Sequence, residues 1–157
     1  MRSIKEFPVL VTPAVERASF ARASEEAGAD AVSLVNTFLG MAIDVESRRP
    51  KLSNIVGGLS GPAIRPIAVR MVYECRRAVK IPIVGMGGIA SASDVLEFLI
   101  AGATAVQVGT ANFVDPFIWT KLLDGLRDYL QRHAIAHVSD LTGTIDTTAR
   151  EKEWISS

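Results

Sequence analysis

Short runs of apolar, often β-branched residues alternate along the chain with longer stretches whose apolar positions recur at helical spacing. This alternation predicts βα units, in which the strands form a parallel sheet and the helices cover it. Four such units are expected between residues 8 and 132. Their strands are predicted at residues 8–12, 31–36, 81–84 and 104–108.

Residues typical of helix ends mark the last two units. Ser91 and Asp94 offer a capping box for a helix that ends at Gly102. Asp115 and Pro116 suit the N-cap and the first position of a last helix that reaches about residue 132. The two earlier helices are expected near residues 15–27, with Gly28 as C-cap, and near residues 64–79.

The connection from residue 37 to about residue 61 shows no clear periodicity. Connections longer than about 12 to 15 residues in compact domains are usually lids or binding loops. We therefore expect a functional loop here. The domain plan that follows is a leader at 1–7, a half (β/α)8 barrel at 8–132 and a polar C-terminal tail at 133–157.

The predicted fold class is α/β, the C-terminal half of a TIM (β/α)8 barrel with about four parallel βα units. A complete barrel needs about 250 residues, whereas this chain has 157. Distinct loops after each strand argue against a solenoid. A doubly wound open sheet also agrees with the periodicity and stays open as an alternative.

Composition excludes several classes of protein. Lys plus Arg equals Asp plus Glu at 17 each, so no global basic field exists to attract nucleic acid or an anionic membrane. The apolar run near the N-terminus is too short for a signal peptide, and no other run reaches spanning length. The single cysteine, Cys75, rules out an internal disulfide and fits a reducing compartment. We expect a cytoplasmic protein.

Glycine-rich turns follow the last two predicted strands. Gly87 and Gly88 follow one, and Gly109 and Thr110 follow the other. Backbone N–H groups beside a helix N-terminus favour an anion, and barrels often bind phosphate with their last two loops. Glycines that only permit tight turns are the alternative. The adjacent pair of turns favours a phosphate site.

Polar and glycine residues also follow the second strand and its long connection. The amide of Asn36 can donate and accept at once, which suits a planar heterocycle or a carboxylate, and Thr37 adds a hydroxyl. An asparagine that starts a turn is the alternative. Gly61 can bring backbone against a flat ligand or a phosphate, or act as a hinge.

Cys75 lies within a predicted helix and is expected to be a buried small hydrophobe.

Four strings together resemble the class 1 dihydroorotate dehydrogenases, particularly the catalytic subunit of the NAD-linked (1B) type. They are SLVNTFLGMAIDVESRRP, VGGLSGPAIRPIAVRMV, IPIVGMGGI and TAVQVGTANFVDP. The resemblance implies a (β/α)8 barrel with FMN at its mouth, of which this chain supplies strands five to eight. It also implies oxidation of dihydroorotate to orotate in pyrimidine biosynthesis.

The resemblance assigns roles to matching positions. Asn36 and Thr37 correspond to the pair that binds the pyrimidine of dihydroorotate or orotate. The flavin contacts, chiefly to the phosphate and ribityl end, correspond to Val35, Gly61, Gly87, Gly88, Gly109 and Thr110. No metal ligand is implied.

Two departures from the family pattern stand out. The family's catalytic base is a cysteine in the first half of the barrel, so no catalytic residue is predicted in this chain. A lysine that contacts the flavin is expected where this chain has Leu10. We therefore expect an enzyme half that is inactive without an N-terminal half-barrel, or one that self-associates to cover its open edges.

Other functions stay open at this level. An iron–sulfur flavoprotein that passes electrons onward is a further partner implied by the NAD-linked type. The first alternative to the enzyme half is a non-catalytic FMN or phosphate-binding module. The absence of the expected flavin-contacting lysine, where this chain has Leu10, favours it. The second is a relative of dihydropyrimidine dehydrogenase, against which the string NTFLGMAID argues.

Overall fold

Three of the predicted strands form one parallel sheet in the computed structural model, which describes residues 17–148. The strands are β1 (Val32–Leu34), β6 (Ile83–Met86) and β7 (Ala105–Gln107), in the order β1-β6-β7. All three run in the same direction, so their carboxyl ends meet at one edge of the sheet. The predicted strand at 8–12, with Leu10, lies outside the described residues.

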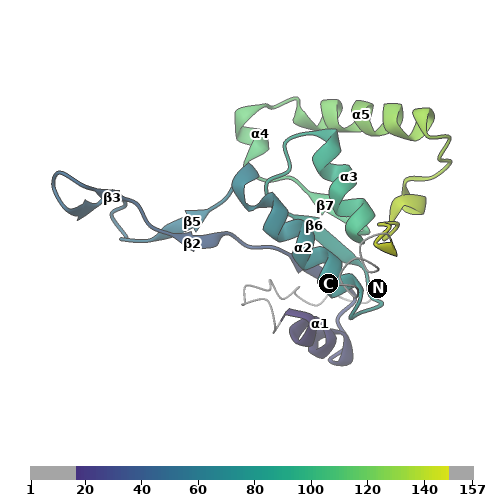
Figure 1. The fold of residues 1–157 in the computed structure, drawn as a ribbon, viewed down its shortest axis with the longest axis horizontal. Helices are drawn as coiled ribbons and strands as arrows, with labels where there is room; N and C mark the ends of the chain where they lie inside the picture. The colour runs from purple at the N-terminus through teal and green to yellow at the C-terminus, as the bar shows by residue number, and fades with distance from the viewer. Residues whose placement is uncertain (1–16, 149–157) are drawn as a thin grey trace, which may run out of the picture.

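Helices cover one face of this sheet. Helix α1 (Arg17–Glu26) packs against α2 (Arg65–Arg76), and α3 (Ala92–Ala101) lies between α2 and α5 (Ile118–Arg132) (Figure 1). The register places Leu34, Gly85 and Val106 side by side on the face that α2 and α3 cover. Phe98 of α3 occupies the space that a side chain at Gly85 would need.

The opposite face of the sheet carries Ser33, Val84 and Ala105 in one row. Met86 and Gln107 pair in the next row, nearer the carboxyl ends of the strands. Ala105 and Gln107 are exposed, whereas the helix-facing residues of β1 and β6 are buried. A sheet with helices on one face and side-chain rows on the other is the arrangement of a (β/α)8 barrel wall.

Most predicted helix ends are confirmed. The capping box forms: the Ser91 hydroxyl accepts from the Asp94 N–H, and the Asp94 carboxylate accepts from the Ser91 N–H. Gly28 and Gly102 follow their helices with φ of 86° and 125°, a region that favours glycine. Cys75 is fully buried within α2, as expected.

The predicted boundaries of three elements were wrong. Helix α2 ends at Arg76 and not near residue 79. The strand expected to end at Val84 continues to Met86, so Gly85 belongs to the sheet and not to the turn. Helix α5 begins at Ile118 and not at Pro116, because the Asp115 carboxylate accepts from the Phe117 N–H and forms a turn before the helix. A short helix, α4 (Ala111–Val114), precedes this turn.

The connection from 37 to 61 is not irregular, as the sequence suggested, but a β-ribbon. Its inner pair is β2 (Phe38–Gly40) with β5 (Gly57–Leu59), and its outer pair is β3 (Ile43–Asp44) with β4 (Arg49–Pro50), both antiparallel. The ribbon projects away from the helices and the sheet (Figure 1). The 3₁₀-helix η1 (Pro62–Ile64) then leads the chain into α2.

The segment after α5 returns to the end of the sheet that lies opposite the carboxyl ends of the strands. It contains the 3₁₀-helix η2 (Val138–Leu141), whose Leu141 is buried. The N–H groups of Gly143 and Ile145 donate to carbonyl groups at the end of α3, at 3.0 and 3.3 Å. Over residues 17–148, none of the helices combines the length and the hydropathy needed to cross a membrane.

Candidate functional site

A pocket of about 590 Å³ opens where the carboxyl ends of the three strands meet. This volume lies in the range of small-molecule and cofactor sites. The walls come from four separate segments: the end of β1, the turn before η1, the turn after β6 and the turn after β7. All eight predicted site residues line it: Val35, Asn36, Thr37, Gly61, Gly87, Gly88, Gly109 and Thr110.

The turn after β6 needs its glycines for close packing. Gly87 and Gly88 have φ of 122° and 77°, which L side chains rarely adopt. A Cβ at Gly88 would lie 2.6 Å from the carbonyl oxygen of Gly61. The absence of this side chain therefore lets two predicted flavin contacts, from separate parts of the chain, lie against each other.

The Asp94 side chain pairs the backbone donors just before α3. Oδ2 of Asp94 accepts from the N–H groups of Ala90 and Ser91, at 2.9 and 2.8 Å. By contrast, within residues 17–148 no protein acceptor pairs with the N–H of Gly87, Gly88 or Ile89. An anion in the pocket would thus meet the amides of the glycine turn, which have no protein partner among the described residues.

The turn after β7 is built differently. Thr110 precedes α4 without a side-chain cap, and no acceptor among the described residues pairs with the N–H of Gly109, Thr110 or Ala111. The Asn112 side-chain amide stabilises the turn by donating to the carbonyls of Val108 and Gly109 at 2.6 and 3.0 Å. A Cβ at Gly109 would meet nothing within 4 Å, so open space faces this residue.

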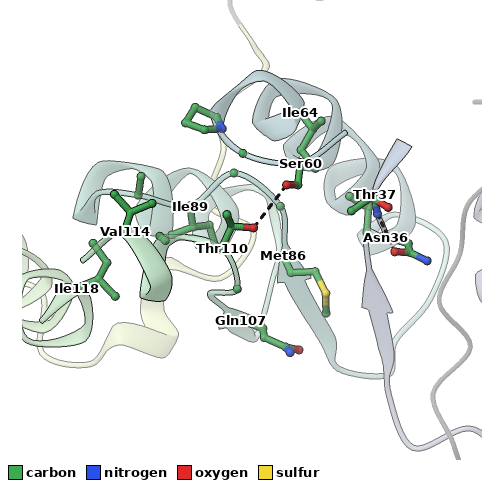
Figure 2. A pocket seen from close by; sticks show the side chains of 18 of the residues that line it. Asn36, Thr37, Ser60, Ile64, Met86, Ile89, Gln107, Thr110, Val114 and Ile118 are labelled. Carbon is green, nitrogen blue, oxygen red and sulfur yellow. Dashed lines mark hydrogen bonds between the residues drawn. The ribbon is translucent and has the colours of Figure 1, made fainter. Parts of the chain in front are cut away.

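Two hydroxyl groups lie between these turns. Oγ of Ser60 and Oγ1 of Thr110 are 3.5 Å apart in the centre of the pocket (Figure 2). None of the described lining residues is Lys or Arg. Backbone N–H groups and hydroxyls would therefore have to bind an anion here, as they do at other phosphate sites. Sequence reasoning missed Ser60, although its hydroxyl directly precedes Gly61.

Asn36 and Thr37 lie at one end of the pocket, opposite Val114 and Ile118 (Figure 2). Both polar residues are exposed. Oδ1 of Asn36 accepts from the Thr37 N–H at 2.8 Å, a contact to the next residue and not the hydrogen bond to the second residue on that defines an asparagine turn. Its Nδ2 has no protein acceptor among the described residues. An amide donor at the pocket wall with no protein acceptor agrees with the ligand interpretation of Asn36.

Met86 and Gln107 complete the floor of the pocket (Figure 2). They are register partners at the ends of β6 and β7. Neither residue was predicted from the sequence, although each ends its strand, where ligand-contacting residues gather in parallel α/β folds. An amide and a thioether on an otherwise apolar floor would suit the edge and face of a flat, partly polar ring.

Asp115 is the one carboxylate among the described lining residues. The hydrogen bond from Nζ of Lys121, at 2.5 Å, and that from the Phe117 N–H lower the pKa of Asp115 from its ordinary value of 3.8. An ionised, paired carboxylate is a poor proton acceptor at neutral pH. No group of three metal-binding side chains comes together in the described part of the chain.

Comparison with known proteins connects this pocket to one family. The family model described as dihydroorotate dehydrogenase matches residues 2–130. A relative from Porphyromonas gingivalis is 62% identical over 125 residues, which are 80% of this chain and 41% of the relative. One from Geotalea uraniireducens is 52% identical over 146 residues, 92% of this chain and 48% of the relative. Both are named dihydroorotate dehydrogenase B (NAD(+)), catalytic subunit.

Solved structures agree. The Eimeria tenella DHODH in complex with ferulenol is 27% identical with a TM-score of 0.70, over 82% of this chain and 34% of that one. The ligand-free form gives a TM-score of 0.69 over 36% of its length. The likeness confirms the predicted fold class, a partial (β/α)8 barrel, and not the alternative of an open doubly wound sheet. The chain spans less than half the length of these relatives.

Proposed function

Because the chain belongs to the dihydroorotate dehydrogenase family, we propose that it is the FMN-phosphate and pyrimidine-binding half of an FMN-dependent dihydroorotate dehydrogenase. The reaction is the oxidation of dihydroorotate to orotate in pyrimidine biosynthesis. One observation carries the proposal: the eight residues predicted to bind flavin and pyrimidine come from four separate segments and line one pocket. The names of the relatives favour this proposal over the dihydropyrimidine dehydrogenase alternative.

The donors in the pocket suit the phosphate of FMN. The amides of Gly87 and Gly88 and those of Gly109 and Thr110 would hold it, and the Ser60 hydroxyl would reach the same oxygens. Val35 would contact the ring system. When bound, the flavin supplies a hydride acceptor for dihydroorotate. This chain's contribution is to orient the cofactor and substrate in a largely apolar site.

Asn36 and Thr37 would orient the pyrimidine. The Asn36 oxygen is fixed by the Thr37 N–H, so its Nδ2 is held as a donor toward a carbonyl or carboxylate oxygen of the ring. The Thr37 hydroxyl can add a second polar contact. Both residues stand at the far end of the pocket from Val114 (Figure 2). Substrate and the apolar wall of α4 would therefore lie at opposite ends.

Catalysis needs more than these residues provide. The described lining residues include no cysteine, histidine or lysine that could take a proton. The relatives are more than twice as long as the part that this chain matches. We therefore propose that the rest of the barrel, with its cysteine base, completes the site, or that self-association covers the open sheet. An iron–sulfur flavoprotein subunit would carry electrons to NAD, and the complex would work in the cytoplasm.

Flavin titration and a turnover assay test the proposal together. The purified 157-residue chain should quench FMN fluorescence on binding, and it should show no dihydroorotate-dependent dye reduction. Adding the remaining barrel segment of a close relative should restore reduction. Absence of FMN binding would count against the cofactor site, whereas turnover by the chain alone would count against the missing base.

A second candidate is a module that binds FMN without catalysis. Asp115, the one carboxylate at the described pocket wall, is held in an ion pair with Lys121 and is thereby unsuited to accept a proton. The same two measurements separate the candidates. FMN binding that persists without dye reduction, even after the remaining barrel segment is supplied, would favour the binding module.

A further inference from the structure

A partly buried ion pair lies directly behind the pocket without lining it. Asp94 of α3 is 5% exposed, and its Oδ1 accepts a hydrogen bond from Nη1 of Arg65, the first residue of α2. Glu97 adds a weaker contact, 3.4 Å from Nε of Arg65. A buried carboxylate is retained at low energetic cost only when it is paired and hydrogen-bonded. Here the pairing residue is 29 positions away in the sequence.

The two carboxylate oxygens of Asp94 perform separate tasks. Oδ2 fixes the N–H groups of Ala90 and Ser91, at the end of the glycine turn. Oδ1 is tied to Arg65, which follows η1 and therefore Gly61. The ion pair thus links the segment that carries Gly88 to the segment that carries Gly61.

The contact at Gly88 shows how closely these segments must fit. A Cβ at Gly88 would lie 2.6 Å from the Gly61 oxygen and 2.9 Å from the Cβ of Arg65. Any drift of α2 relative to α3 would separate the two backbones that face the pocket. Groups that position a ligand act effectively only when a second layer of contacts holds them.

Charge gives Arg65 a second effect. Asp94 places a negative charge next to the unpaired amides of the glycine turn, where an unbalanced carboxylate would repel an anion. The Arg65 guanidinium neutralises this charge. We infer that Arg65 and Asp94 are positioning residues of the phosphate-binding turn, which they hold in shape and shield from the carboxylate. This inference rests on the proposed function.

The full chain can be titrated with FMN and, separately, with riboflavin, which has the same ring but no phosphate. Arg65→Gln should weaken FMN binding about tenfold or more, as loss of outer-shell partners does at metal sites, and leave riboflavin binding unchanged. Arg65→Lys should recover part of the FMN affinity. Arg70→Gln is the matched control, because Arg70 lies on the same helix in an exposed pair with Glu74.

Equal losses for both flavins, or an unchanged FMN affinity, would overturn the inference. Hydrogen exchange provides a readout that needs no flavin. The amides of Ala90 and Ser91 should lose protection in Arg65→Gln and keep it in Arg70→Gln. If the parent chain bound no FMN, the proposed function would fail. The positioning role would still be supported by this change in exchange, and unchanged exchange would overturn it.

Discussion

The two glycine turns of the pocket are built on opposite plans. The turn after β6 is packed from behind: Gly88 lies against the backbone of Gly61, and Asp94 and Arg65 fix its far end. The turn after β7 is open: nothing lies within 4 Å of a Cβ at Gly109, and Phe113 and Val114 of α4 are 91% and 82% exposed. The conformation of the turn after β6 is therefore fixed by contacts with other segments of the chain.

This difference shows which part of the site is preorganised. The turn after β6 is held by long-range contacts that persist without a ligand, so its amides are available at no ordering cost. The turn after β7 depends chiefly on the local hydrogen bonds of Asn112. We expect ligand or the remaining barrel to complete its surroundings. Substitutions in the two turns should therefore separate effects on stability from effects on binding.

The largest contrast is expected between Gly88→Ala and Gly109→Ala. The first forces a side chain into a positive-φ position against backbone and should lower the free energy of unfolding by at least about 2 kcal/mol. The second should change it by no more than about 0.5 kcal/mol. Urea unfolding measures both. Equal destabilisation would show that the two turns are packed alike.

FMN titration of the same two variants sharpens the contrast. The open space at Gly109 faces the pocket, so a methyl group there would take room from a bound phosphate. Gly109→Ala should therefore weaken FMN binding although the fold is intact. Unchanged affinity in this variant would place the phosphate elsewhere in the pocket.

A smaller effect is expected from Asn112→Ala. This change removes the amide that donates to the Val108 and Gly109 carbonyls and should cost about 1 to 2 kcal/mol of stability. Asn54→Ala on the exposed ribbon is the control, since none of the described hydrogen bonds uses its side chain. Chemical denaturation of both variants provides the test. A loss no greater than that of the control would mean that the turn is held by other contacts.

Much of the pocket could be predicted because its signals are local. The strands, the capping box at Ser91 and the polar or glycine residues after each strand are all determined by neighbours in the sequence. Parallel strands bring their carboxyl ends together, so residues predicted separately had to meet. That topology is why the eight predicted residues share one pocket, although their roles in binding stay predictions.

The features that were missed depend on distant partners. The ribbon strands have only two or three residues each and acquire their pairing from the whole ribbon. Apolar residues such as Leu39 in β2 and Ile43 in β3 stay exposed, so no alternation marks these strands. Arg65 has no local sign of its partner, because Asp94 lies 29 residues further on. The start of α5 was predicted wrongly because the Asp115 side chain caps a turn instead of the helix.

The smallest effect should come from Asp115, beside the open turn. Hydrogen bonds from Lys121 and the Phe117 N–H lower its pKa in the folded chain. A lowered pKa means that the ionised carboxylate stabilises the fold above the unfolded pKa and that this contribution disappears as pH falls. Asp115→Asn should therefore be less stable than the parent at neutral pH, and the difference should shrink as the pH falls below the ordinary pKa of 3.8.

Urea unfolding at several pH values measures this difference, with Asp124→Asn as control because Asp124 forms an exposed pair with Arg127 on α5. The Asp115 variant should show the larger pH dependence, since its carboxylate accepts from both a side chain and a backbone group. The ionised Asp115 carboxylate, which acid protonates, would then stabilise part of the open turn after β7. A difference that did not shrink as the pH fell below 3.8, or that matched the control throughout, would show that the turn before α5 does not depend on the ionised carboxylate.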